Sequence, residues 1–198
     1  MRSIPLFALA LVLFASSAFA QSAQHVRGDI VSIEGTKLTI RTRTGDTVPI
    51  ELADNYKVVA VVPAPRDAIR TGAFVGTAAM PQSDGTQRAL EVLVFPESGR
   101  GSGEGHYPWD LRPGSTMTNA TVAEVTKVDQ DQRLTLKYKD GEKTIVVPRD
   151  APVVTFEPGS REMLRAGAHV LVNARPKADG ALTAASVLVG KDGLVPPM

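Results

Sequence analysis

Cysteine is absent from this chain of 198 residues, so it can form no disulfide and cannot be anchored through a lipidated cysteine. Aromatic residues make up only 5% of the chain, and tryptophan occurs once, as Trp109. Neither sign of charge is in excess, because 22 Lys and Arg stand against 21 Asp and Glu. Proteins that bind nucleic acid normally carry a clear basic excess that neutralises phosphates, so this balance argues against a nucleic-acid partner.

Long hydrophobic runs are lacking except near the beginning of the chain. Arg2 precedes an apolar run at 4–14, and the small residues Ala18 and Ala20 frame a cleavage site. This order is typical of a secretory signal peptide, and the apolar run is too short to span a bilayer. We therefore expect residues 1–20 to be removed after Ala20, and we expect a soluble periplasmic or secreted protein with no membrane span.

Motifs that support catalysis are also missing. There is no Cys nucleophile and no Gly-x-Ser-x-Gly sequence, and the histidines His25, His106 and His169 lack the close spacing of metal ligands. The glycines within 99–105 are followed by Tyr107 and Pro108 rather than by a helical segment, so they do not fit a phosphate-binding loop. We expect a protein that is not an enzyme and that needs no cofactor.

A pattern that occurs twice is the main positive feature of the chain. The repeats cover 26–95 and 118–190, and Gly72 and Gly85 both return 95 residues later (167 − 72 and 180 − 85). The matching segments are 38–40 with 134–136, 69–73 with 164–168, and 80–85 with 175–180. This regularity indicates two copies of one structural unit.

Apolar and polar residues alternate within each repeat, as in half-buried β-strands. The strands expected in the first repeat are 25–34, 37–43, 47–52, 73–80 and 87–94, with a short additional strand at 57–61. Those expected in the second are 119–127, 133–139, 143–148, 168–175 and 181–189, with a short additional strand at 153–156.

One short helical turn is expected in each repeat, between its third and fourth main strands. Pro65 suits the first helical position and Ser160 suits an N-cap, while Gly72 and Gly167 would end the two turns. Five strands with a helix after the third are typical of an OB-like barrel. We therefore predict an all-β fold of two tandem OB-like small β-barrels, each with one short helical turn. A β-sandwich of two Greek-key halves is the alternative.

The predicted domains are a signal peptide, two repeats, a linker and a tail. Their boundaries are 1–20, 21–95 for the first barrel, 96–117 for the linker, 118–190 for the second barrel, and 191–198 for the tail. The linker belongs to neither repeat. Its first part is rich in glycine, and its second part is rich in aromatic residues and proline.

The candidate ligand-binding residues lie in this linker: His106, Tyr107, Trp109 and Asp110. We favour a packing role, in which Trp109 and Leu111 fill the groove between the barrels and His106 caps a turn, because a lone tryptophan is usually a packing anchor. A long-range metal site with His106 and Met117 is a weaker possibility.

The opening Val-x-Gly-x-Ile-x-x-Ile at 26–33, with Gly72 and Asp84-Gly85, resembles a bacterial family of small secreted β-barrel domains of unknown function. The resemblance implies OB-like folds over both repeats, although 119–121 reads Asn-Ala-Thr where the first repeat has Arg-Gly-Asp. The linker segment 103–111 also resembles proteobacterial relatives that are labelled as metal-transport proteins. Neither resemblance implies a catalytic residue.

The function expected from these features is binding within the cell envelope. The partner would be an envelope protein or a small ligand held by the linker and the barrel rims. A metal-handling accessory protein for copper or zinc is one alternative, and a glycan-binding module that uses an OB-like face is another.

Overall fold

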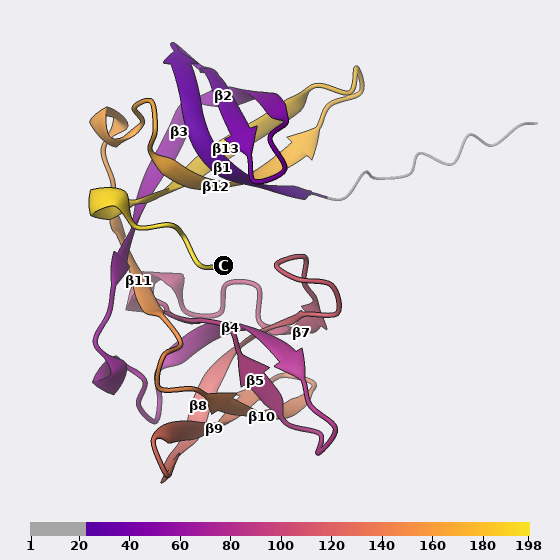
Figure 1. The fold of residues 1–198 in the computed structure, drawn as a ribbon, viewed down its shortest axis with the longest axis vertical. Coiled ribbons are helices and arrows are strands. Elements are labelled where there is room, and N and C mark those ends of the chain that lie inside the picture. The colour runs from indigo at the N-terminus through magenta and orange to yellow at the C-terminus, as the bar shows by residue number, and fades with distance from the viewer. Residues whose placement is uncertain (1–22) are drawn as a thin grey trace, which may run out of the picture.

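A computed structural model describes residues 23–198, so the expected signal peptide lies outside the described residues. The fold is all-β, as predicted, and its strands form two lobes stacked along the long axis (Figure 1). The strands of the first half are β1 Gln24–Glu34, β2 Lys37–Thr42, β3 Thr47–Pro63, β4 Phe74–Pro81, β5 Gln87–Ala89, β6 Val92–Val94 and β7 Gly105–Pro108. Those of the second are β8 Thr116–Val128, β9 Asp131–Tyr138, β10 Gly141–Val147, β11 Val153–Pro158, β12 His169–Pro176 and β13 Leu182–Gly190.

The terminal lobe is a closed barrel of five strands. Its strands are neighbours in the order β13, β12, β1, β2 and β3, and each neighbouring pair is antiparallel. Parallel pairing of β13 with β3 then closes the ring. Strands from both ends of the described chain build this lobe, in which the indigo strands β1 to β3 lie next to the orange and yellow strands β12 and β13 (Figure 1).

The central lobe repeats this order of pairings with other strands. Antiparallel pairs join β4 to β8, β8 to β9, β9 to β10 and β4 to β5. The parallel pair β10–β5 completes a second cycle, as β13–β3 does in the terminal lobe. Strand β7 adds to the outer edge of β8 and has no counterpart in the terminal lobe among the described strands.

The two sequence repeats exchange strands between the lobes. The terminal lobe takes β1, β2 and β3 from the first repeat but β12 and β13 from the second, and the central lobe has the reverse arrangement. Backbone hydrogen bonds show the same reciprocity: Gly72 donates to Val122, and Gly167 donates to Ile30. The pairing therefore differs from the expected tandem arrangement, because neither repeat closes a ring by itself.

The chain crosses between the lobes through an antiparallel ladder of β3 and β11. Five residue pairs form this ladder, with Val61 opposite Phe156 at its centre. These two residues are 95 positions apart (156 − 61), the spacing that relates the repeats. The ladder therefore pairs equivalent residues across an approximate two-fold axis, and the expected short strands at 57–61 and 153–156 are the two arms of the crossing.

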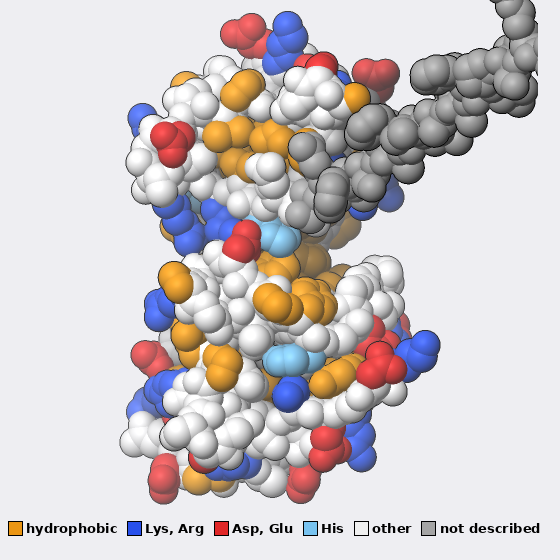
Figure 2. Space-filling model, turned by 90° about the vertical axis from the view of Figure 1, so that its right-hand side faces the viewer, with side chains coloured by type: hydrophobic (Ala, Val, Ile, Leu, Met, Phe, Trp, Pro, Cys, Tyr) orange, Lys and Arg blue, Asp and Glu red, His pale blue; other side chains and the backbone are white. Residues whose placement is uncertain are grey.

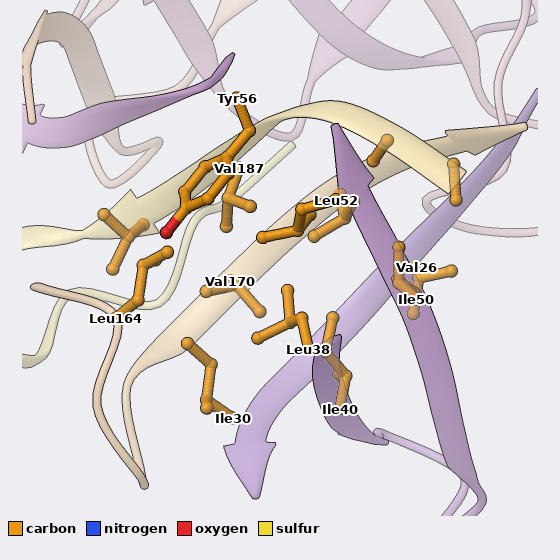
Figure 3. Packing of buried hydrophobic residues seen from close by; sticks show 14 residues of the cluster. Val26, Ile30, Leu38, Ile40, Ile50, Leu52, Tyr56, Leu164, Val170 and Val187 are labelled. Atoms are coloured by element: carbon orange, nitrogen blue, oxygen red, sulfur yellow. The ribbon is translucent and has the colours of Figure 1, made fainter. Parts of the chain in front are cut away.

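Each lobe has its own hydrophobic core, built by both repeats. In the terminal lobe, Leu38 and Ile40 from β2 meet Val170 from β12 and Val187 from β13 (Figure 3). The central core combines Val75 and Val92 with Leu134 and Leu136 in the same manner. Burial of these side chains contributes about 25 cal/mol per Å² of apolar surface removed from water, so each lobe gains its stability only when both repeats are in place.

The expected helical turns are single 3-10 turns, η1 Arg66–Ala68 and η3 Arg161–Met163. Pro65 stands at the N-cap rather than inside the first turn, and Ser160 is the N-cap of η3 without a side-chain bond to the backbone. Two further 3-10 turns are η2 Glu97–Gly99 and η4 Lys191–Gly193. No helix of the described residues is long and apolar enough to cross a membrane.

Candidate functional site

A cavity of about 420 Å³ lies between the two lobes and is lined by residues from both. Figure 2 shows this region as a hollowed waist in which hydrophobic side chains gather. The lining residues are His25, Gly76, Glu91, Leu93, Phe95, Ser102, Tyr107, Trp109, Met117, Asn119, Phe156, Leu171, Asn173, Ser186, Leu188 and Met198. The cavity is large enough for a small molecule and has a mostly apolar wall with a few polar groups, as binding sites do.

Equivalent positions of the two repeats meet in this wall. Gly76 and Leu171 are 95 residues apart, as are Leu93 and Leu188, and all four line the cavity. Phe156, which lies on the approximate two-fold axis, also lines it. The cavity is therefore a product of the strand exchange, and its chemistry comes from the positions at which the repeats differ.

Glu91 is one such position. It lies at the interruption between β5 and β6, where its Oε1 accepts a hydrogen bond of 2.9 Å from the backbone N–H of Ala78. Its equivalent, Ser186, lies at the register shift of β13 against β3. Glu91 is fully buried, and its Oε2 has no hydrogen-bond partner among the described residues. Burial raises the pKa of this carboxyl to about 8, against the opposing effect of the Ala78 hydrogen bond, so the neutral acid predominates at pH 7.

Aromatic rings form a large part of the wall. The Trp109 ring lies 4.2 Å from the His25 ring and 6.2 Å from Tyr107, measured between centroids. Phe95 and Phe156 pack edge to face at 5.9 Å. The indole Nε1 of Trp109 is buried without a hydrogen-bond partner among the described residues. A buried indole N–H usually has a partner, so this donor and the Glu91 oxygen are two free polar atoms at one site.

A clasp between the lobes holds Trp109 in place. Asp110 accepts a hydrogen bond of 2.7 Å from Arg27 and contacts the His25 ring at 3.0 Å, and both partners lie on β1. The Arg27 guanidinium lies 5.8 Å from the centroid of the Trp109 ring and also donates to the backbone oxygen of Met198. Partial burial tends to raise the pKa of Asp110, but the hydrogen bond and charge of Arg27, with His25, hold that pKa below its ordinary value.

The four candidate residues of the linker, His106, Tyr107, Trp109 and Asp110, do not all face the cavity, because His106 and Tyr107 are adjacent in strand β7. Adjacent residues of a strand point to opposite faces, so Tyr107 faces the cavity while His106 faces away. His106 is hydrogen-bonded to Thr118 Oγ1 at 2.9 Å and stacks on Tyr138, and partial burial and then the charge of Lys143 lower its pKa. His106 thus lies within a strand rather than at the turn it was expected to cap.

The structure does not bring the two weak metal candidates together. Met117 stands opposite Tyr107 in the β7–β8 ladder and lines the cavity, whereas His106 stands opposite Thr118 on the other face. Within residues 23–198, no cluster of three or more His, Asp or Glu side chains could hold a metal ion.

Sequence reasoning missed the most unusual residue of the site, Glu91. A signal was present, because Glu91 is the one charged residue within the apolar segment 89–95, where a β-strand was expected. Acidic side chains are almost never fully buried without a partner, so an acid in such a segment is a candidate functional group. Comparisons of the chain with protein-family models, with curated proteins and with solved structures find no match.

Proposed function

We propose that this protein is a non-enzymatic binding protein of the cell envelope, and that it holds a small ligand in the cavity between its lobes. The observation that carries the proposal is the pair of unsatisfied buried polar atoms, Glu91 Oε2 and Trp109 Nε1, at one mostly apolar cavity. Leaving such an atom without a partner costs about 1–3 kcal/mol, which a ligand that hydrogen-bonds to it would offset.

The strand order supports a further proposal, that each lobe is an OB-like unit. In both lobes the pairings join five strands in a ring with one parallel pair. A single 3-10 turn precedes the fourth barrel-forming strand of each repeat, η1 before β4 and η3 before β12, where an OB-like fold has its helix. The proposed ligand site is therefore the junction of two such units and not the outer face of either.

Binding can be measured through Trp109, because it is the only tryptophan and it lines the cavity. We expect N-phenyl-1-naphthylamine, a neutral apolar dye, to bind the protein (residues 21–198) at a ratio of one to one. Its emission should increase on binding, and the fluorescence of Trp109 should be quenched by energy transfer to the dye.

Two substitutions to phenylalanine, one in the cavity wall and one at an exposed position, test where the dye binds. Leu93→Phe adds a ring to the cavity wall and should weaken binding at least tenfold, whereas Val128→Phe adds the same ring at an exposed position and should leave binding unchanged. Equal binding by Leu93→Phe and the parent protein would contradict the proposal, as would the absence of one-to-one binding by the folded parent.

A further inference from the structure

We propose that the cavity selects an organic cation, an ammonium group carried on a small apolar body. This inference rests on the proposed function, because it names the class of ligand for the same cavity. Three properties of the wall lead to it: the sign of its charge, its aromatic rings, and the unused bonding capacity of its one acid.

Among the side chains that line the cavity, a single one can carry the negative charge that would pair with a cation. Glu91 is the only acidic side chain among the described lining residues, and no Lys or Arg is among them. Arg27 lies 5.8 Å from the centroid of the Trp109 ring, but its guanidinium is already paired with Asp110 at 2.7 Å and donates to the Met198 oxygen. An anionic ligand such as a fatty acid or a phosphate would find no free cation here, and burying an unpaired charge is costly.

The rings of the wall suit a cation more than they suit a neutral body. Trp109, Tyr107, Phe95 and Phe156 all line the cavity. The faces of such rings attract ammonium groups, and the attraction is stronger where water is excluded. Aromatic walls with a nearby carboxylate are a general solution to the recognition of alkylammonium groups.

The bonding of Glu91 provides the third argument. One oxygen completes the interrupted ladder through Ala78, and the other has no partner. When an ammonium group enters, the carboxyl loses its proton to solvent and becomes the counter-ion, so that binding exchanges one proton for one cation. The other titratable groups at the cavity are His25, Tyr107, the α-carboxylate of Met198 in the 21–198 protein and, at the rim, Asp110 with Arg27.

The pH dependence of affinity distinguishes a cation from a neutral ligand. The pKa of Glu91 is about 8, so the affinity for a permanently charged ammonium should rise about tenfold per pH unit from 6 to 8 and then level off. A neutral hydrogen-bond acceptor would need the protonated acid, so its affinity would fall above pH 8 instead.

The experiment compares three probes of similar size by calorimetry with the 21–198 protein: benzyltrimethylammonium, its neutral isostere neopentylbenzene, and the anion phenylacetate. We expect the cation to bind at least tenfold more tightly than the other two at pH 8. We also expect the stated rise between pH 6 and 8, which should persist in a His25→Gln variant. Glu91→Gln should abolish both the preference and the rise, while Glu157→Gln, the same change at an exposed carboxylate outside the cavity wall, should retain them.

The outcomes separate this inference from the proposed function. If N-phenyl-1-naphthylamine binds but the cation shows no preference over neopentylbenzene, the inference is wrong and the binding cavity stands. If neither the dye nor any probe binds to the folded protein, both are wrong. Should Glu91→Gln fail to fold, Trp109→Leu provides the second test, because it should weaken binding of the cation more than binding of the dye.

Discussion

The terminal lobe and the central lobe share one order of strand pairings, yet they differ at equivalent positions near their junction. The hydrogen bonds of Gly72 to Val122 and of Gly167 to Ile30 show that β1 and β8 are related by 92 residues (122 − 30). Gly28 of the terminal lobe thus corresponds to Ala120 of the central lobe. By the same relation His25 corresponds to Met117, and by the 95-residue relation Glu91 corresponds to Ser186.

This difference separates scaffold from chemistry. The positions that keep their apolar character, such as Leu93 and Leu188, build the wall of the cavity symmetrically. The positions that change, such as Glu91 against Ser186, give that wall a polar side. Strand β7 adds Tyr107, and the segment after it adds Trp109, to the central lobe alone. A symmetric frame with asymmetric substituents can hold a ligand in one orientation.

The largest effect should come from separating the two repeats. We expect fragments 21–95 and 96–198 to be unfolded alone, because each lobe needs strands from both. Mixing the two fragments should restore a folded complex, as seen by circular dichroism and by dispersed amide resonances. A cooperative thermal transition from either fragment alone would contradict the strand exchange between the lobes, because that repeat would then form a closed barrel by itself.

A substitution at Gly28 should show that the lobes tolerate different residues at one equivalent position. In Gly28→Ala the new Cβ would lie 2.0 Å from the backbone oxygen of Arg41, which cannot move without disturbing the β1–β2 ladder. We expect a loss of about 3 kcal/mol or more in the free energy of unfolding. The reverse change, Ala120→Gly, should cost about 1 kcal/mol. Urea denaturation measures both, and equal costs would contradict the prediction.

The pair Glu91 and Ser186 should differ in how stability depends on pH. The folded-state pKa of Glu91 is raised from 4.5 to about 8, so its ionisation penalises folding increasingly between these values. The penalty grows by at most about 1.4 kcal/mol per pH unit. We expect Glu91→Gln to be more stable than the parent by about 2 kcal/mol near pH 7.5, since the unpaired amide offsets part of the gain.

At pH 4.5 Glu91→Gln should instead be less stable than the parent by about 1–2 kcal/mol, because ionisation then penalises the parent very little while the cost of the unpaired amide remains. Ser186→Ala should show no pH-dependent difference from the parent between pH 4.5 and 8. Thermal denaturation across this range tests both variants. A Glu91→Gln protein whose stability difference is the same at all pH values would show that Glu91 is ionised in the folded state.

The clasp should have the smallest effect on stability. Asp110→Asn removes the ion pair with Arg27, and because Asp110 is half exposed we expect a loss below about 1 kcal/mol at pH 7. The pKa of Asp110 is below its ordinary value, so this contribution is present at neutral pH and is lost as the pH falls below about 4. In Asp110→Asn the fluorescence emission of Trp109 should shift to longer wavelength at pH 7, because the clasp no longer holds the indole. The control Glu157→Gln, in the exposed pair with Lys191, should leave the emission unchanged.

Much of the local structure could be predicted from the sequence. The expected strand at 73–80 is β4, and the expected strand at 181–189 is β13, each displaced by one residue. Gly72 and Gly167 have φ of 85° and 81°, a conformation that glycine adopts without strain. Neither ends the helical turn as expected, because η1 stops at Ala68 and η3 at Met163, and each glycine lies in a separate turn that follows. Strand β7 was missed because Gly105 and Pro108 favour loops, whereas pairing with β8 imposes an extended backbone.

The site was predictable only in part. The sequence directed attention to Tyr107 and Trp109, and the structure places both in the cavity wall. It equally suggested His106, which strand alternation turns to the other face. Phe95 and Phe156 could not be associated with them, because they are far apart in the chain and meet only where the lobes join.

The amino-acid sequence by itself determined the all-β class, the positions of most strands and the correspondence between Gly72 and Gly167, because alternation and turn chemistry act over a few residues. Only the tertiary structure decided which strands pair, since the same apolar faces could close within one repeat or between two. It decided in favour of exchange, with β3 and β11 crossing at Val61 and Phe156. The exchange of strands creates the cavity, because it places Glu91 of the first repeat beside the linker and beside strand β13 of the second repeat.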